Sequence, residues 1–362
     1  MIRIERRQPV QPAAGVALRL VGVLIALLLG ASFLAFTGHD ARAAYLDMLR
    51  GAVGSSYSLQ QTIVKAIPLA LTGLGVALAF HAGLWNIGAE GQLTMGAFLA
   101  SWAALFVHAP AWVLLPLMVA LGLAGGALWA LLPAIPRALF GTNEIITTLL
   151  LNYVALLWVD YLVFGPWADP SSYSFPYSRP FPDAARLPTL PGLQVHLGAV
   201  FVVVIAAAMT FVLRRTTWGY AIRVIGHSPR AATYAGMPLV GNILLVMMLS
   251  GAIAGLAGMV EVSAVIGRIQ EGISPGYGYS AIIIAWLARL NPWGTVFMAV
   301  FFAALINGGF ALQTSGVPAA IASMVQALVL FSVLASDFFV THRLTLRRVP
   351  PEPVPLEAHA KP

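Results

Sequence analysis

Residues 79–98 read AFHAGLWNIGAEGQLTMGAF and place three strongly polar side chains, Asn86, Glu90 and Gln92, between long apolar runs. Trp85 comes directly before them. A charged side chain at the centre of a bilayer costs about 2.5–3.5 kcal/mol even on the mildest scale. The stretch is therefore predicted to form a break between two membrane spans, where these four residues line or brace a polar path instead of facing lipid.

The composition on both sides of this stretch is that of a membrane protein. Of 362 residues, 59% are hydrophobic and 9% are charged, whereas an ordinary soluble domain carries roughly 25% charged residues. A spanning helix needs ~20 apolar residues. The apolar runs predict an all-α membrane protein with about ten spans, near residues 16–37, 62–82, 91–108, 112–132, 145–164, 196–213, 239–261, 278–290, 294–312 and 317–337.

Two of these runs differ from an ordinary spanning helix in length or position. The first is longer than the apolar region of a signal peptide, so we expect it to be retained as a helix instead of being cleaved. The eighth, 278–290, is short and has polar ends, which predicts a broken or partly inserted helix packed inside the protein.

The basic residues indicate orientation. The net charge is +7, but the basic residues lie mostly in short segments between apolar runs, which favours a topology signal over binding to nucleic acid. Ten crossings put both termini on one side, and that side carries fourteen of the twenty Lys and Arg residues. The positive-inside rule then places both termini in the cytoplasm. The opposite side is predicted to carry Arg42, Arg50, Lys65, Arg179, Arg186 and Arg268.

The predicted spans divide the chain into a cytoplasmic segment (1–15), a transmembrane domain (16–338) and a proline-rich cytoplasmic tail (339–362). An external connection at 165–192 contains seven prolines. This composition predicts an ordered surface segment, which either docks a partner or serves as a passive crossover.

The spans also contain a weak internal similarity. The second and seventh spans run in opposite directions and both carry closely spaced glycines, so the helix groups 62–164 and 239–337 are predicted to be related by inversion. In GAIAGLAG, 251–258, the glycine spacing predicts close helix packing.

A second polar stretch, TNEIITTLLLNYV at 142–154, adds candidates for the path: Asn143, Glu144, Thr148 and Asn152. Thr148 and Asn152 are i, i+4 neighbours, so they share one helix face. Amides and hydroxyls in a dry cavity hold a neutral, sugar-like or base-like solute without trapping it by charge. Hydrogen bonding between helices, or capping of a helix end by Glu90 and Glu144, is the competing interpretation.

Residues 218–241, WGYAIRVIGHSPRAATYAGMPLVG, predict a short helix between the sixth and seventh spans. Ser228 suits the N-cap, Pro229 suits the first helical position, and Gly236 ends the helix. A helix this short is not stable alone, so a partner is expected to contact it, at about 228–236.

The sequence also argues against chemistry performed by this chain. Neither of its two lysines, Lys65 and Lys361, ends a phosphate-binding loop of the G-x-x-x-x-G-K-[ST] type. There are no cysteines for disulfides or thiolate sites, and the notable histidines, His81 and His108, are interpreted as packing or interfacial residues. We predict no catalytic residues and no metal site, and we expect energy to come through a partner.

The motifs together resemble a known family, the permease subunits of bacterial ABC importers for branched-chain amino acids, ribose and nucleosides. The resemblance covers roughly residues 60–340 and rests on five segments in the expected order: AFHAGLWNIGAEGQLTMGAF (79–98), GTNEIITTLLLNYVA (141–155), GHSPRAATYAGM (226–237), SGAIAGLAGMVEV (250–262) and ARLNPWGTVFMAVFFAALINGG (288–309). Ala288 departs from the pattern, since relatives usually carry glycine before the arginine. The segment NIGAEGQ resembles the nucleoside branch more than the ribose type.

The resemblance implies a ten-helix type II importer fold with two inverted repeats. It implies pairing with a second permease subunit, often a different chain, and with an ABC ATPase, which in some relatives is a fused double domain. ATP and Mg would bind that ATPase and not this chain. A periplasmic or lipoprotein solute-binding protein would deliver the solute. The segment that matches the family's coupling helix contains Ser228, Pro229, Arg230, Tyr234 and Gly236.

The sequence is thus interpreted as a permease subunit of an ATP-driven nucleoside importer in the bacterial inner membrane. One alternative is an ABC importer for a simple sugar or another base-bearing solute. A more distant alternative is a secondary carrier that acts alone.

Overall fold

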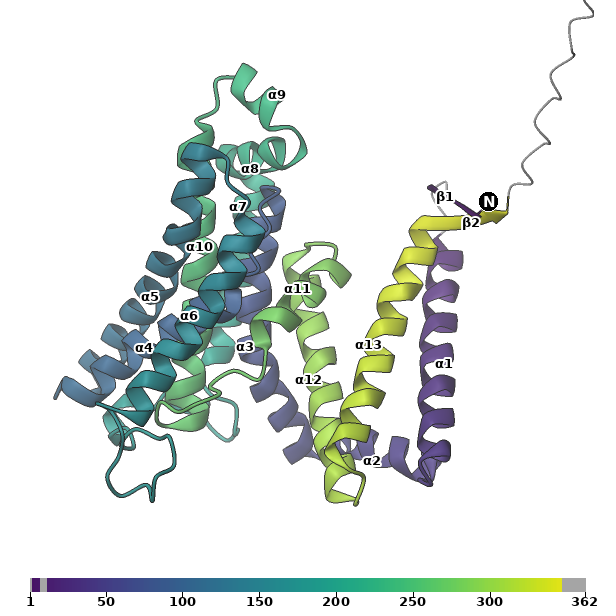
Figure 1. The fold of residues 1–362 in the computed structure, drawn as a ribbon, viewed down its shortest axis with the longest axis horizontal. Coiled ribbons are helices and arrows are strands. Elements are labelled where there is room, and N and C mark those ends of the chain that lie inside the picture. Colours follow the sequence, from purple (N-terminus) through teal and green to yellow (C-terminus); the bar gives the residue numbers. More distant parts are fainter. Residues whose placement is uncertain (1, 7–11, 347–362) are drawn as a thin grey trace, which may run out of the picture. The chain divides into compact units, whose positions relative to one another are not determined.

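A computed structural model describes residues 2–6 and 12–346, and these residues are almost entirely helical (Figure 1). The elements in chain order are β1 (Ile2–Arg6), α1 (Pro12–Phe36), α2 (Ala41–Val53), α3 (Ser56–His81), α4 (Ala89–Phe106), α5 (Ala111–Phe140), α6 (Glu144–Phe164), the 3-10 helix η1 (Asp183–Ala185), α7 (Gly198–Arg215), α8 (Thr217–His227), α9 (Pro229–Tyr234), α10 (Leu239–Val260), the π-helix η2 (Glu261–Ile266), α11 (Tyr277–Leu287), α12 (Pro292–Thr314), α13 (Ala319–Thr341) and β2 (His342–Leu346). Most of the predicted tail, 347–362, lies outside the described residues.

The chain divides into two compact units, residues 1–45 with 316–362, and residues 46–315. In the smaller unit, α1 packs along α13, and the Tyr45 hydroxyl donates to the Leu27 carbonyl at 2.7 Å. The strands β1 and β2 pair antiparallel, with Ile2 opposite Leu346. Neither strand was predicted, because each has only five residues at the end of a long apolar run.

Each of the ten predicted apolar runs falls on a helix, and the shortness of the eighth is confirmed by α11, which has eleven residues. By length and composition, seven of the described helices are able to cross a membrane, or eight if the bent pair formed by α1 and α2 counts as one span. The helices α4 and α11 are not among them. The helices α2 and α8 were not predicted.

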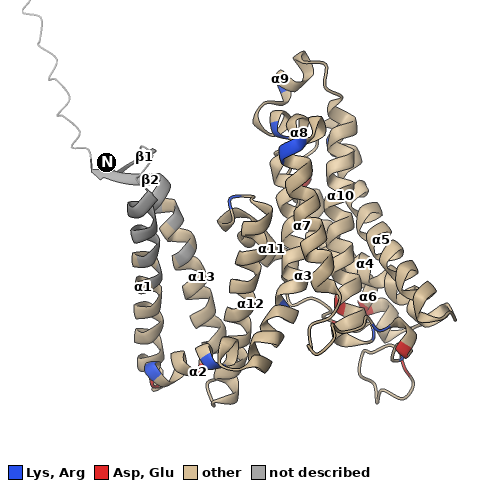
Figure 2. Cartoon of the chain, turned by 180° about the vertical axis from the view of Figure 1, so that it is seen from behind, with Lys and Arg blue, Asp and Glu red and all other residues tan. Residues whose placement is uncertain are grey.

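Figure 2 shows the described charged residues gathered mainly near helix ends, as a multi-pass membrane protein requires.

Glycines bring α4, α5 and α10 into close contact at the centre of the larger unit. A Cβ atom at Gly255 would collide with the Gly122 carbonyl of α5, and one at Gly258 would collide with the Leu93 carbonyl of α4. A Cβ atom at Gly251 would collide with α5 as well. The predicted packing role of these three α10 glycines is confirmed. Small residues allow this approach because membrane helices associate through van der Waals contact.

The segment 165–192 is ordered, as its composition predicts, and lies at the end of the larger unit opposite α9 (Figure 1). The Ser178 N–H donates to the Ile269 carbonyl at 2.9 Å, and the Phe181 N–H donates to the Gly267 carbonyl at 2.8 Å. In the same segment, hydrogen bonds from the Ser171 N–H and hydroxyl hold the pKa of the Asp169 carboxyl below its ordinary value.

The glycine contacts give a direct test. Gly255→Leu inserts a side chain where α10 touches α5, and overpacking of this kind costs about 1–3 kcal/mol. We expect a clearly lower melting temperature for the purified chain in detergent, measured by differential scanning fluorimetry. Gly241→Ala is the matched control on the same helix, since a Cβ there meets open space. Equal melting of the two variants would contradict this packing.

Candidate functional site

The connection between α3 and α4 turns back into the bundle. After His81 the chain reverses at Gly83, whose φ of 70° favours glycine. The Asn86 amide then reaches the Ser250 hydroxyl of α10 at 2.9 Å, and that hydroxyl donates to the Gly75 carbonyl of α3 at 2.7 Å. Gly75 lies about 9 Å back from the end of α3 along the helix axis. The predicted break is therefore present, and Asn86 lies beside the interior of α3 and not beyond its end.

Asn86 is the centre of the hydrogen bonds that satisfy this turn. Its side-chain nitrogen donates to the Gln92 side-chain oxygen at 2.9 Å, and its side-chain oxygen accepts from the Gln92 side-chain nitrogen at 2.9 Å. The same oxygen accepts from the Gly88 N–H at 3.1 Å. Asn86 and Gln92 are buried. Irregular backbone inside a membrane protein needs such partners, because lipid supplies none.

Asn152 of α6 stabilises the turn from the other side. Its oxygen accepts from the Gly91 N–H at 2.8 Å, and its nitrogen donates to the Ile87 carbonyl at 2.9 Å. Thr148, one turn earlier, is buried on the same face, and its hydroxyl donates to the Glu144 carbonyl at 2.6 Å. The shared helix face predicted for Thr148 and Asn152 is thus present.

Glu90 joins the starts of two helices. It lies in the first turn of α4, and its carboxylate accepts from the Gly278 N–H in the first turn of α11 at 2.6 Å. Ser274 and Gly276 lie beside the same carboxylate. Glycine at 278 is required, because a Cβ there would collide with the Glu90 backbone nitrogen. The partial positive charges of two helix N-termini therefore converge on one buried carboxylate.

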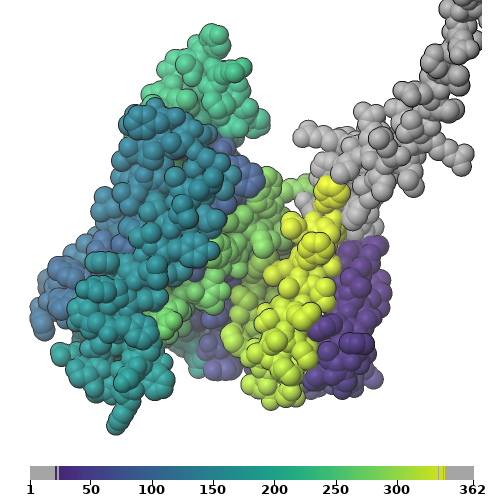
Figure 3. Space-filling model, in the orientation of Figure 1, coloured from purple at the N-terminus to yellow at the C-terminus, as the bar shows by residue number. Residues whose placement is uncertain are grey.

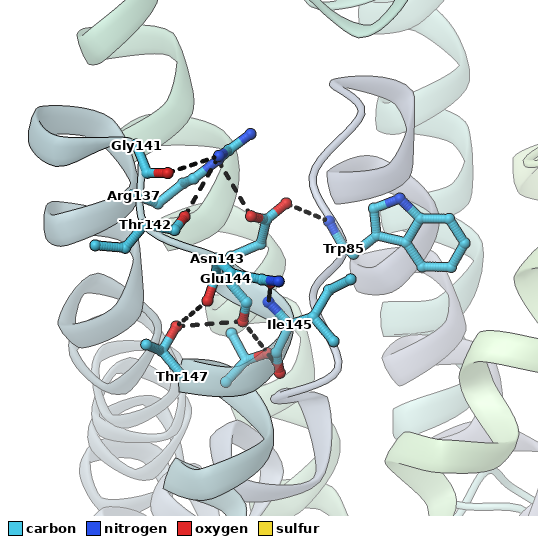
Figure 4. A network of polar contacts seen from close by, with 9 residues as sticks. Trp85, Arg137, Gly141, Thr142, Asn143, Glu144, Ile145 and Thr147 are labelled. Carbon is cyan, nitrogen blue, oxygen red and sulfur yellow. Dashed lines mark hydrogen bonds and ion pairs between the residues drawn. The ribbon is translucent and has the colours of Figure 1, made fainter.

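Figure 4 shows a second polar group, where the connection between α5 and α6 meets the α3–α4 connection. The Glu144 carboxylate forms an ion pair with the Arg137 Nε at 3.2 Å and accepts from the Trp85 N–H at 3.3 Å. Arg137 also donates to the carbonyls of Gly141 and Thr142. Asn143 is exposed and caps α6 by accepting from the Ile145 N–H at 2.9 Å. Asn143, which was predicted as a path residue, therefore caps α6, while Glu144 joins the ends of α5 and α6 to the α3–α4 connection.

The predicted short helix is present as α9. The Ser228 hydroxyl accepts from the Ala231 N–H at 3.2 Å, Pro229 starts the helix, and Gly236 follows it with a φ of 72°. Ala232 is buried, whereas Tyr234 is 94% exposed. Figure 3 shows this part of the chain projecting from one end of the larger unit, where its exposed residues are accessible to a partner.

A backbone contact connects the α8–α9 segment to the break. A Cβ atom at Gly226, near the end of α8, would collide with the His81 carbonyl, and one at Gly83 would press on the Gly226 backbone. A cleft beside this contact is lined by residues that include Arg137, Pro229 and Ile243. Movement of α9 therefore has a short route to the α3–α4 connection and to Trp85.

The sequence did not predict that Lys65 lies deep in α3, within electrostatic range of Glu261. Lys65 was expected near the surface, but α3 begins at Ser56, so Lys65 lies about 13 Å into that helix. Its ammonium group lies 5.5 Å from the centroid of the Tyr277 ring. Glu261, at the start of η2, is buried and lies within electrostatic range of Lys65. Glu261, the isolated acidic residue of the seventh apolar run, was the sequence signal that could have indicated this site.

The predicted path residues thus form two groups. Asn86, Glu90, Gln92, Thr148 and Asn152 form one buried cluster around the break. Trp85, Asn143 and Glu144 lie in the second polar group, where Trp85 and Asn143 are exposed and Glu144 is buried. Within the described part of the chain, no group of three or more His, Asp and Glu residues is arranged to hold a metal ion.

This arrangement is that of a multi-pass membrane protein with a polar helix break connected to a projecting end. The chain belongs to the family described as branched-chain amino acid transport system / permease component, whose model matches residues 58–334. It is a permease subunit of an ABC importer and not an enzyme. Membership implies an ATPase and a solute-binding protein as partners.

Three similar proteins show the range of solutes in the family. The glucose ABC transporter permease protein TsgB13 of Haloferax volcanii is 38% identical, over 95% of this chain and 93% of its own. The guanosine ABC transporter permease protein NupP of Bacillus subtilis is 32% identical, over 88% and 92%. The nucleoside ABC transporter permease protein NupB of Lactococcus lactis is 29% identical, over 87% and 89%.

Among solved structures, the chain is similar to a metal-chelate type ABC transporter in an inward-facing conformation. The identity is 16%, the TM-score is 0.48, and the match covers 88% of this chain and 98% of the other. At this TM-score the similarity does not establish a shared fold.

The Glu90 junction generates a stability prediction. Glu90→Leu removes the acceptor between two helix N-termini, and loss of hydrogen bonds to a charged group costs about 1.5–3 kcal/mol. We expect the melting temperature to fall in the order wild type, Glu90→Gln, Glu90→Leu, because glutamine keeps one oxygen acceptor. Glu271→Gln, on an exposed connection, is the control. A Glu90→Leu chain as stable as wild type would show that the junction does not need the carboxylate.

Proposed function

We propose that this chain is a permease subunit of an ATP-driven importer that moves nucleosides across the bacterial inner membrane. The observation that carries the driven mechanism is the contact of Gly226 with the Gly83 turn, because it joins the projecting α8–α9 segment to a polar break at membrane depth. The nucleoside assignment is supported by the segment NIGAEGQ, 86–92, and by the similarity to NupP and NupB.

In this proposal α9 is the coupling helix and faces the cytoplasm, as do both termini. Ser228, Pro229 and Gly236 shape the helix, and Arg230 and Tyr234 contact the ATPase. ATP and Mg bind that ATPase, which is a separate chain, and its domains are fused in some arrangements of this kind. Support comes from the exposure of Tyr234 and from the basic residues near the α9 end, which the positive-inside rule places in the cytoplasm.

A second permease subunit, a different chain, completes the path, and a periplasmic or lipoprotein binding protein delivers the solute to the opposite end, including 165–192. The chain is similar both to NupP and to the guanosine ABC transporter permease protein NupQ of Bacillus subtilis, the latter at 28% identity over 67% of this chain. NupP and NupQ are both named as guanosine permeases of one organism, and this supports the pairing of two different permease chains.

The helix pattern supports two inverted repeats of a type II importer. The first helices of the two groups, α3 and α10, cross where Ser250 meets Gly75, and the second helices, α4 and α11, start at the shared Glu90 junction. In this proposal the buried amides and Glu90 stabilise the side of the translocation path. The path opens next to them when the two inverted helix groups rotate relative to one another.

A simple sugar is the second candidate, because TsgB13, a glucose permease by name, is 38% identical to this chain. Glucose and the ribose of a nucleoside present similar hydroxyl groups, so the amides of the break do not discriminate between them. A stand-alone carrier is disfavoured by membership of the permease family.

The solute class is tested by uptake in the native host with and without this gene. We expect deletion to abolish high-affinity uptake of labelled guanosine and to leave glucose uptake unchanged. Loss of glucose uptake alone would replace the nucleoside proposal with the sugar candidate, and uptake that persists without ATP would exclude an ATP-driven importer.

The coupling role of α9 is tested by Tyr234→Ala. Tyr234 is the most exposed large hydrophobic side chain on α9, so its removal should lower ATP-dependent uptake severalfold while the chain remains in the membrane. Tyr161→Ala, which shortens an exposed tyrosine at the far end of α6, is the control and should leave uptake near the wild-type rate. Equal uptake by the two variants would reject α9 as the coupling helix.

A further inference from the structure

An exposed aromatic cluster lies beside the break. Trp85 and Trp286 are 42% and 46% exposed, and their ring centroids are 5.7 Å apart. Phe80 supports both rings, with centroids 5.2 Å from Trp85 and 5.9 Å from Trp286. These spacings are those of paired aromatic rings, and both indoles keep part of their surface uncovered by the described chain.

The cluster continues along α11 to a polar group. Tyr279 is exposed and lies seven residues before Trp286, which places it on the same helix face about 10 Å away. Its hydroxyl accepts from the Asn152 side-chain nitrogen at 3.3 Å, and that nitrogen also donates to the Ile87 carbonyl. The aromatic face is therefore continuous with the buried cluster around the break.

Lipid is a poor occupant of this face. The backbone beneath it includes the irregular turn 82–88 and the start of α11, which reach membrane depth at Asn86 and Glu90. Irregular backbone at that depth is tolerated only next to protein or a water-filled cavity. The exposed rings thus border the interior of the transporter, and the amide and hydroxyl beside them suit a solute that is both flat and polar.

We propose that Trp85 and Trp286 form a stacking surface for the planar ring of the transported solute, with the Tyr279 hydroxyl, which Asn152 holds in place, facing its polar edge. This inference rests on the nucleoside proposal and extends it, because it assigns recognition of the base to named residues. Glu144 positions Trp85 by accepting its backbone N–H, and the Gly83–Gly226 contact links the same turn to α9. The stacking surface is thereby placed where movement of α9 alters it.

The test uses the complete transporter in its host and compares two replacements at each tryptophan. Leucine keeps an apolar side chain but cannot stack, whereas phenylalanine keeps a ring. We expect Trp85→Leu and Trp286→Leu each to lower the ratio of maximal uptake rate to KM for labelled guanosine by about tenfold, within the range for loss of base stacking. The Phe variants should stay within about threefold of wild type. Trp112→Leu, at the exposed start of α5, is the control and should not change uptake.

Each alternative gives a different result. Leucine variants with wild-type guanosine uptake would overturn the inference and assign the face to lipid. Loss of uptake together with loss of ATPase co-purification would overturn it in favour of a contact with the second permease. If the wild-type chain imports glucose and not guanosine, the nucleoside proposal fails first, and the stacking surface fails with it.

Discussion

The architecture of the larger unit depends on one buried carboxylate. Glu90 starts α4 and accepts the N–H of Gly278 at the start of α11, so two helices that begin inside the membrane are joined at their N-termini. Each N-terminus presents unsatisfied N–H groups and a partial positive charge, and a carboxylate compensates both. Without this interaction neither α4 nor α11 has a reason to begin at membrane depth, and the turn braced by Asn86 and Asn152 would have no fixed position.

The junction is consistent with a permease that works with a partner ATPase. The glycine contacts of α4, α5 and α10 form a rigid block, since close backbone packing leaves little room for relative movement. The break is attached to this block by the hydrogen bond from Asn86 to Ser250 of α10, and to α8 by the Gly83–Gly226 contact. In the proposed mechanism, a force applied at α9 is transmitted to the turn that carries Trp85, while the helices that span the membrane keep their packing.

Much of this arrangement is predictable from local sequence. Apolar runs predict the helices, Ser228, Pro229 and Gly236 predict α9, and the spacing of Gly251, Gly255 and Gly258 predicts close packing, because each signal lies within one or two helical turns. The contacts between residues that lie far apart in the sequence do not follow from such local patterns. Asn86 meets Ser250 and Glu90 meets Gly278 across 164 and 188 residues, and Lys65 reaches Tyr277 only because α3 begins earlier than its apolar run. The aromatic cluster likewise joins Trp85 to Trp286, and nothing near either residue indicates the other.

The central claim is that the α8–α9 segment is the cytoplasmic end through which a separate ATPase moves the break. The chain has no cysteine, so Tyr234→Cys introduces a single thiol at an exposed position of α9. Labelling with a membrane-impermeant maleimide in intact spheroplasts and in inside-out vesicles measures its side directly. The account predicts labelling in the vesicles, reduced when the ATPase is bound, and none in spheroplasts. Labelling in intact spheroplasts would contradict it.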